Sequence, residues 1–140
     1  IKMFLAFYPK HWFGEVVRFD CRGRKGKGVI EIINLSQHNE ISYEILVDDE
    51  PYDIQGTVFE NEIVSSDSDK ICFHQVQIQS RFSFRQHVSF FKAQQLVKGN
   101  VYGISIDEKL KCYYEVHIED TNIHQPMVSE TEILLPEGMI

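Results

Sequence analysis

The sequence predicts an all-β protein, built as a small barrel or a sandwich. Apolar and polar residues alternate with period two in many short segments, and the apolar positions favour the β-branched and aromatic types that strands prefer. Clusters of Gly, Pro, Asn, Asp and Ser separate these segments. No long stretch shows helical periodicity. With 140 residues, the chain has the size of one domain.

The first half of the chain contains four predicted strands. A turn rich in Gly, Lys and Arg separates the first two, and it occupies residues 22–27. Acidic residues followed by Pro51 end the third strand, and a Ser- and Asp-rich run ends the fourth, because such residues favour turns. The four strands are expected at residues 14–19, 28–33, 41–47 and 56–64.

The second half contains four further segments with the same alternation. They lead us to expect strands at residues 70–74, 87–92, 100–106 and 113–118. The remaining residues include Pro126 and Pro136, and proline cannot donate to a strand ladder. We therefore expect the end of the chain to form a tail, an interaction arm or one extra strand.

Charge is arranged in blocks that the net value of −7 conceals. Residues 1–30 carry seven Lys or Arg against two acids, and residues 70–102 carry five basic residues and no acid. Between them, residues 31–69 carry eleven acids and no Lys or Arg, and residues 103–140 are again acidic. Two interpretations remain open. The basic blocks can form one face that meets phosphates, or the acidic segments can fold over them and neutralise them.

Cysteine and histidine positions argue against several kinds of site. Cys21, Cys72 and Cys112 are odd in number and far apart, which is atypical of a disulfide framework or a zinc site. The histidines form no His-x-x-x-His pair, and no Gly-x-Ser-x-Gly motif occurs. We therefore expect no enzyme activity, no catalytic residues, no metal and no cofactor. Reduced thiols indicate a cytoplasmic or nuclear protein, and no apolar run is long enough to span a membrane.

Residues 14–20 read Gly-Glu-Val-Val-Arg-Phe-Asp, and a basic segment at 25–30 and an apolar segment ending in His74-Gln75 follow in that order. This order resembles that of cold-shock domains, with residues 14–20 similar to the opening strand of that family. Residues 25–30 (Lys-Gly-Lys-Gly-Val-Ile) stand where the family has its first nucleic-acid-binding motif, and residues 71–75 (Ile-Cys-Phe-His-Gln) are similar to its second motif. Residues 84–90 resemble the fourth strand, and residues 98–106 resemble the turn into the fifth.

This resemblance implies a five-stranded barrel of the OB type that binds single-stranded nucleic acid. Residues 1–140 would then form a single domain whose barrel core comprises residues 12–33 and 70–106. The acidic residues 34–69 would be an inserted β-hairpin, and residues 107–140 a C-terminal extension.

The chain departs from the family at the positions where aromatic rings stack on bases. Arg18, Lys27, Val29 and Cys72 stand at matching positions, and only His74 resembles the original platform. Cations pair with phosphates rather than with bases, so the predicted binding is dominated by the backbone and weakly selective. RNA is favoured over DNA. The predicted nucleic-acid-binding residues are Arg18, Arg22, Arg24, Lys25, Lys27, His74, Phe82, Arg85 and Lys98.

A protein-interaction module is the alternative prediction. It rests on the missing aromatic platform and on the acidic residues 31–69, which could bind a protein partner or offer a sheet edge for strand addition.

Overall fold

The computed structural model describes residues 3–47, 57–67 and 74–134. These residues form antiparallel strands and two short 3₁₀ turns, which confirms the predicted all-β class. No helix within them has the length and the apolar composition needed to cross a membrane. The strands are β1 (Met3–Phe7), β2 (Val16–Cys21), β3 (Arg24–Ser36), β4 (Ile41–Val47), β5 (Thr57–Phe59), β6 (Ile63–Ser66), β7 (Val76–Ser80), β8 (His87–Lys92), β9 (Gln95–Ile106), β10 (Cys112–Ile118) and β11 (His124–Ser129).

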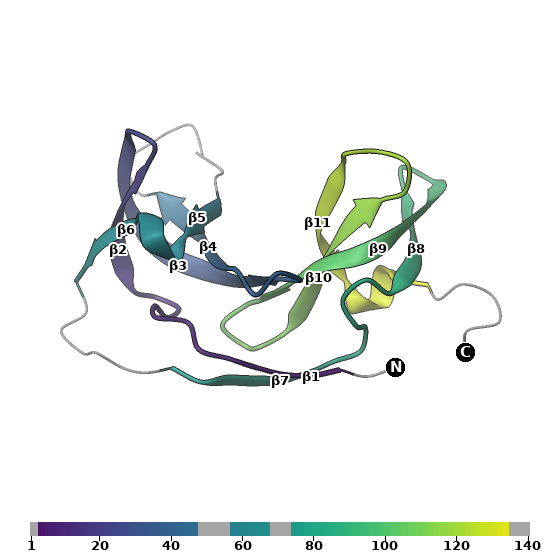
Figure 1. Cartoon of the computed structure of the whole chain (residues 1–140), viewed down its shortest axis with the longest axis horizontal. Helices are drawn as coiled ribbons and strands as arrows, with labels where there is room; N and C mark the ends of the chain where they lie inside the picture. The colour runs from purple at the N-terminus through teal and green to yellow at the C-terminus, as the bar shows by residue number, and fades with distance from the viewer. Residues whose placement is uncertain (1–2, 48–56, 68–73, 135–140) are drawn as a thin grey trace.

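Strands β2 to β6 form a first unit around the long strand β3 (Figure 1). The beginning of β3 pairs with β2 in a tight hairpin, and its later part pairs with β4. β5 adds to β4 at one edge, and β6 adds to β2 at the other. The 3₁₀ turn η1 (Glu60–Glu62) connects these two edge strands.

Strands β8 to β11 form a second unit with the same order of pairing. β9 pairs with β8 in a hairpin and with β10 on its other side, and β11 adds to β10. The 3₁₀ turn η2 (Glu130–Glu132) follows β11 and leads to Leu134, which bridges to Ser89 of β8. Leu134 therefore takes the place that β6 has in the first unit.

The two units are copies of one pattern. Adding 71 to a residue number in β2 or β4 gives the bounds of β8 or β10, and adding 70 to η1 gives η2. In each copy a fully buried tyrosine donates a hydrogen bond to the first glutamate of the 3₁₀ turn. Tyr43 Oη lies 2.6 Å from Glu60 Oε2, and Tyr114 Oη lies 2.8 Å from Glu130 Oε1. The chain therefore contains two copies of one structural repeat.

Backbone details repeat as well. Gly14 and Arg85 both have positive φ just before the hairpin, and Arg22 and Ala93 both have positive φ within its turn. Gly28 and Gly99 stand at equivalent places where the next strand approaches so closely that a Cβ would lie 2.3 Å or 2.2 Å from a carbonyl oxygen. These constraints explain why two different sequences follow the same path.

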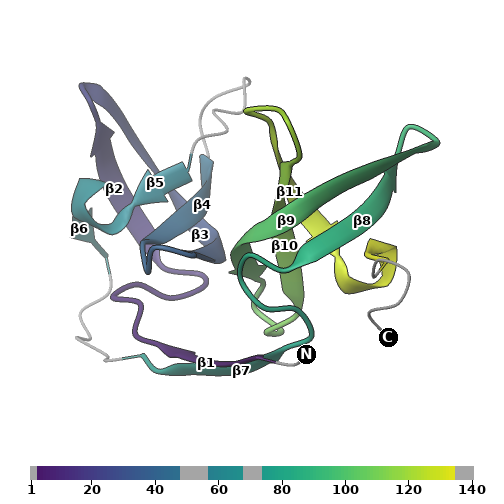
Figure 2. The same cartoon turned by 45° about the vertical axis from the view of Figure 1, so that its right-hand side comes forward.

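Two strand pairs join the units, and each brings equivalent elements together in opposite directions. β3 pairs with β9 around Asn34 and Ser105, which are equivalent positions of the repeat. β1 and β7, the leading strands of the two copies, pair with each other as a separate ribbon centred on Leu5 and Ile78. This ribbon runs along both units (Figures 1 and 2). The arrangement is that of a pseudo-twofold dimer within one chain.

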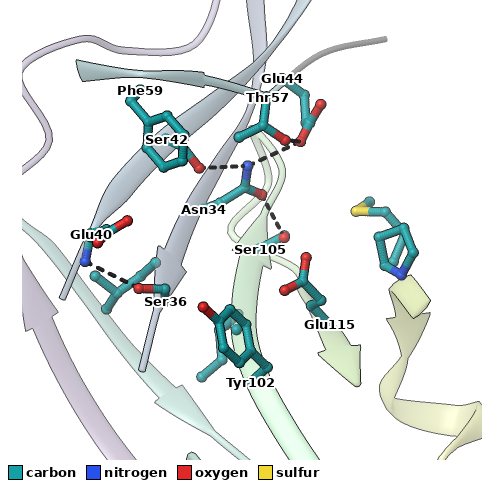
Figure 3. Close-up of a pocket in the computed structure, with 15 residues that line it drawn as sticks. Asn34, Ser36, Glu40, Ser42, Glu44, Thr57, Phe59, Tyr102, Ser105 and Glu115 are labelled. Carbon is teal, nitrogen blue, oxygen red and sulfur yellow. Dashed lines mark hydrogen bonds between the residues drawn. The ribbon is translucent and has the colours of Figure 1, made fainter. Parts of the chain in front are cut away.

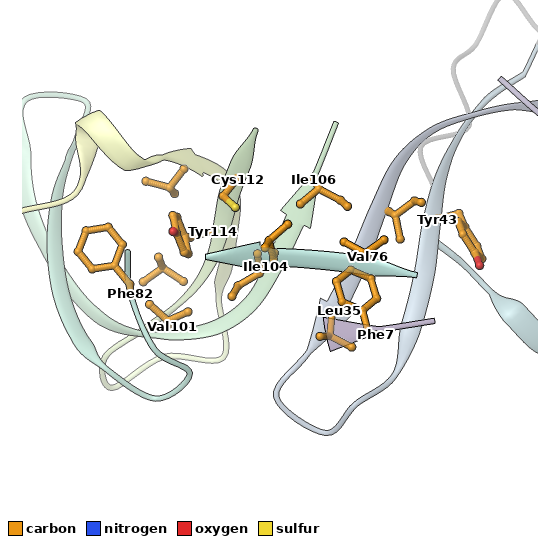
Figure 4. Packing of buried hydrophobic residues seen from close by; sticks show 14 of the residues in the cluster. Phe7, Leu35, Tyr43, Val76, Phe82, Val101, Ile104, Ile106, Cys112 and Tyr114 are labelled. Carbon is orange, nitrogen blue, oxygen red and sulfur yellow. The ribbon is translucent and has the colours of Figure 1, made fainter. Parts of the chain in front are cut away.

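The buried apolar side chains form one cluster that extends through both units. Figure 4 shows Phe7, Leu35 and Val76 between the part of the core that holds Tyr43 and the part that holds Tyr114. The β1–β7 ribbon contributes Phe7, Val76 and Ile78 to this cluster. The ribbon therefore contributes side chains to a core that both units share.

The expected closed barrel is not present in the described residues. The edge strands β5 and β6 do not pair with each other, so the sheet of the first unit stays open. Residues 34–69, expected as an insertion, supply β4, β5 and β6 and so complete the first unit. Residues 107–140, expected as an extension, supply β10 and β11 of the second unit. The predicted strand at residues 70–74 lies almost wholly outside the described residues.

Candidate functional site

The β2–β3 hairpin gathers most of the predicted binding residues. Its register places Arg18 opposite Lys27 and Asp20 opposite Lys25. Because paired residues share a face of a sheet, three basic side chains project from the outer face. β6 extends this face with Ser65, which is paired with Arg18. The core side of the same hairpin carries the buried residues Val17 and Phe19.

The tip of the hairpin adds further positive charge. Arg22 is exposed and occupies the turn with φ of 57°, and Gly23 donates its N–H to Asp20 Oδ1 at 2.8 Å. That bond ties the one acidic side chain of the hairpin to its own backbone. Arg24 pairs with Cys21 and lines a small hollow beside Phe19, so it lies on the opposite face. Arg18, Arg22, Lys25 and Lys27 therefore form the basic surface.

Within the described residues no ion pair joins a carboxylate to this basic surface, although Arg22 lines a hollow together with Glu40, Glu60 and Glu62. The two histidine–carboxylate contacts within ion-pair distance there join His11 to Glu15 and His124 to Glu115, and neither involves the hairpin. Residues 16–29 contain five Lys or Arg and one acid. The alternative in which acidic residues fold over the basic block is met in part by residues 31–47 and 57–67, because Glu40, Glu60 and Glu62 line one hollow with Lys10 and Arg22. The acidic residues at 48–56 and 68–69 lie outside the described residues.

The remaining predicted residues do not join the hairpin. Arg85 and Lys98 are exposed on the second unit, where Lys98 pairs with Ser89. The His74 ring stacks on Trp12, with centroids 4.6 Å apart and planes 13° apart, at the start of the β1–β7 ribbon. Eight of the nine predicted residues are thus divided among three places, and the ninth is Phe82.

Phe82 is not available for stacking on a base. Its side chain is 0% exposed and meets the ring of Tyr114 edge to face at 5.1 Å. The hydroxyl of Ser80 donates to the Phe82 carbonyl at 2.6 Å and fixes the segment against the core. The prediction of an exposed loop ring was wrong, because tertiary packing between β7 and β10 buries this residue.

The equivalent hairpin of the second unit has a different surface. Phe91 and Leu96 pair with each other there and are 60% and 51% exposed. They stand where the first unit has Asp20 and Lys25. The repeat has therefore kept its backbone while the outer faces of the two hairpins have acquired different chemistry.

A pocket of about 150 Å³ lies where the two units meet (Figure 3). Its walls come from β3, β4 and β5 of the first unit and from β9, β10 and β11 of the second. Asn34 and Ser105, the central pair of the β3–β9 contact, form part of its lining. Sequence reasoning missed this pocket, because it is created by the pairing of two repeats.

Five polar side chains of the pocket form one hydrogen-bonded network, and Glu115 makes a separate contact. Ser105 Oγ donates to Asn34 Oδ1 at 2.6 Å, and Asn34 Nδ2 donates to Ser42 Oγ at 3.2 Å and to Glu44 Oε1 at 3.1 Å. Thr57 Oγ1 donates to the same Glu44 oxygen at 2.9 Å. On the second unit Glu115 Oε2 lies 3.2 Å from His124 Nδ1. Glu44 and Glu115 are equivalent residues of the repeat.

Several side chains that lie away from the basic surface and the pocket have pKa values raised by burial. Desolvation, with support from the carboxylates of Glu130 and Asp107, raises the pKa of Cys112 to about 11. Desolvation and the hydrogen bond to Glu60 raise the pKa of Tyr43 well above its ordinary value. Burial likewise raises the pKa of Tyr114. At neutral pH these groups are therefore protonated and carry no charge.

Glu15 shows the opposite shift. Partial burial disfavours its charge, but hydrogen bonds from His11, Ser66 and the backbone of Trp12 outweigh it and lower the pKa. The carboxylate therefore fastens the loop before β2 to the end of β6.

Comparisons with known protein families, with curated proteins and with solved structures find no match to this chain. The resemblance to cold-shock domains therefore stays a prediction from the residue pattern. What the chain binds has to be inferred from the charge and shape of its surfaces.

Proposed function

We propose that the chain binds single-stranded nucleic acid, RNA in the first place, through the phosphate backbone. The basic surface of Arg18, Arg22, Lys25 and Lys27 carries this proposal. Its cations are exposed, share one hairpin and have no carboxylate within ion-pair distance among the described residues. A phosphate chain supplies the anions that this surface lacks, and releasing its counterions drives binding.

The spacing of the cations suits an extended phosphate chain. Residues two apart on a strand are separated by about 6.6 Å, so Lys25 and Lys27 reach different phosphates. Arg18 lies across from Lys27 on the neighbouring strand and widens the surface. Arg22 extends it to the tip. The long side chains can therefore follow the backbone without any change in the sheet.

The same surface offers little for reading bases. The other residues of its outer face are Val16, Asp20 and Val29, and none has a ring on which a base could stack. Stacking on aromatic side chains contributes about 1–3 kcal/mol per base where it occurs. Binding through this hairpin is therefore dominated by phosphate contacts and weakly dependent on sequence.

Charge-removing variants test the assignment of the surface. We expect Arg18→Gln, Lys25→Gln and Lys27→Gln together to weaken binding of a fluorescein-labelled oligouridylate by about tenfold or more, because three phosphate contacts are lost. Fluorescence anisotropy at low salt measures the affinity. A labelled oligothymidylate compares DNA with RNA, and a labelled duplex compares double-stranded with single-stranded nucleic acid.

The matched control removes three exposed cations from the second unit, at Lys92, Lys109 and Lys111. This variant has the same net charge as the hairpin variant and should keep most of the affinity. An equal loss in both variants would show that net charge, rather than the hairpin, governs binding, and would contradict the proposal.

A protein-interaction role is the second candidate, and exposed apolar side chains favour it. Within residues 31–69, Leu46 is 47% exposed and Val64 is 70% exposed on the edge strand β6. Deleting residues 31–69 would not test this role, since it would remove β4, β5 and β6. Leu46→Ser and Val64→Ser test it instead: a surface that binds protein requires these side chains, whereas binding of oligouridylate does not.

A further inference from the structure

We propose that the pocket between the two units binds an alkylammonium cation, supplied by a lysine side chain or by a free amine. The proposal does not depend on the hairpin, because the pocket lies at the β3–β9 junction. It is lined by both copies of the repeat and exists only where they meet.

The charge of the pocket selects a cation. Glu44 from the first unit and Glu115 from the second both line it, together with Glu40, and no Lys or Arg is among its lining residues. Figure 3 shows Glu44 on one side of the Asn34–Ser105 pair and Glu115 on the other. Carboxylates from both units therefore line the space in which a cation would bind.

Each of the two carboxylates keeps one oxygen available. Oε1 of Glu44 accepts hydrogen bonds from Asn34 and Thr57, while its Oε2 has no hydrogen-bond partner among the described residues. Oε2 of Glu115 faces His124, and its Oε1 has no partner there either. An ammonium group carries three N–H donors, with which it can bind such a free carboxylate oxygen.

The rest of the lining is apolar and aromatic. Phe59 and Tyr102 contribute rings, and Ile104, Pro126 and Met127 contribute aliphatic or thioether surface. Aromatic rings attract cations that have left water, and aliphatic walls suit the methylene groups that carry an ammonium. The volume of about 150 Å³ is roughly five times the ~30 Å³ that one water molecule occupies in the liquid. A short alkylamine therefore fits.

A metal ion fits this pocket less well. No group of three His, Cys, Asp or Glu side chains placed to hold a metal occurs within residues 3–47, 57–67 and 74–134. Hard cations such as Ca²⁺ require six to eight oxygen ligands. Two carboxylates among aromatic and aliphatic walls match an organic cation better.

The polar floor of the pocket is already ordered. Asn34 accepts from Ser105 and donates to Ser42 and Glu44, so its amide and the Glu44 carboxylate are fixed from several sides. A pre-organised site binds more tightly because less side-chain freedom is lost on association. The pairing of β3 with β9 thus provides both the position and the rigidity of the site.

An NMR titration of the full chain tests the proposal, with n-butylammonium chloride as the free amine and Nα-acetyl-lysine methylamide as the lysine arm. We expect saturable shifts of the Gly103, Thr57 and Met127 signals with either probe. The probe with the higher affinity shows whether the ammonium group comes from a lysine side chain or from a free amine. n-Butanol, which has a similar shape and no charge, should produce no saturable shift. Saturable binding of butanol at the same affinity, or no saturation by either cation, would overturn the proposal.

Two double variants distinguish the effect of the pocket carboxylates from the effect of the overall charge of the protein. Glu44→Gln with Glu115→Gln should weaken butylammonium binding by at least about tenfold, the equivalent of losing one strong charged contact. Glu108→Gln with Glu119→Gln removes two exposed acids of the second unit that do not line the pocket, and should leave the affinity unchanged. Melting temperatures check that both proteins fold.

The single variants cover the case in which the double variant fails to fold. Glu115→Gln leaves the Asn34 network intact and should weaken binding alone. Equal affinities for the wild type and the Glu115→Gln variant would contradict the site. The hairpin variant provides an independent comparison: it should lose oligouridylate and keep butylammonium.

Discussion

At the scale of single residues, two buried tyrosines determine how each unit closes. Tyr43 and Tyr114 are each 0% exposed, and each donates its hydroxyl hydrogen to the first glutamate of the following 3₁₀ turn. The turn is thereby held against β4 in the first unit and against β10 in the second. A hydrogen bond to a charged group contributes more than one between neutral groups, about 1.5–3 kcal/mol.

We expect Tyr114→Phe to lower the free energy of unfolding by about 1.5–3 kcal/mol, because the ring stays and the bonds to Glu130 and Ser80 are lost. Tyr113→Phe is the matched control, since the Tyr113 hydroxyl is half-buried and reaches only Asp107 at 3.5 Å. Its effect should stay within about 0.5 kcal/mol. Urea unfolding measures both, and equal losses would argue against the role given to Tyr114.

At the scale of elements, the hairpin of each unit depends on one close approach. Gly28 of β3 lies against the Leu46 carbonyl of β4, and Gly99 of β9 lies against the His117 carbonyl of β10. A side chain at either place would push the central strand away from its neighbour. The hairpin and its basic surface would then lose their support.

Gly28→Ala and Gly99→Ala should each destabilise the chain by about 1–3 kcal/mol, the usual cost of overpacking a tight contact. Gly103→Ala provides the control on β9, because its nearest atom would be 3.4 Å away, an ordinary contact. Thermal unfolding of the three variants measures the difference. A loss for Gly103→Ala as large as for Gly99→Ala would contradict this explanation.

The strands themselves could largely be predicted from the sequence. Alternation identified residues 41–47 and 87–92 with the bounds that the structure has, because each strand has one face on the core. β1 and β7 were missed, since their pairing joins segments about seventy residues apart and leaves little local signal. β11 was expected only as a tail or an extra strand, because Pro126 interrupts its pattern.

At the scale of the whole molecule, the internal repeat was the signal that sequence reasoning overlooked. Tyr-Glu recurs at 43–44 and 114–115, and Glu-x-Glu-Ile recurs at 60–63 and 130–133. Read together, these pairs indicate two copies of one repeat. Without them, residues 34–69 resembled an insertion rather than half of a unit.

The two candidate sites also differ in whether the sequence could predict them. The basic surface was predictable because its residues are close in the sequence, so one hairpin turn brings them together. Arg85, Lys98 and His74 were grouped with them by the order of motifs, which does not determine position between two units. The pocket could not be predicted, because Glu44 and Glu115 meet only through the β3–β9 register.

The salt dependence of oligouridylate binding tests the central claim most directly. Four phosphate contacts to single-stranded nucleic acid predict that log K falls with log salt concentration with a slope of about −2.8. The Arg18→Gln, Lys25→Gln, Lys27→Gln variant keeps one of these contacts and should approach about −0.7. Absence of binding at low salt, or one common slope for both proteins, would contradict a basic hairpin that holds a phosphate backbone.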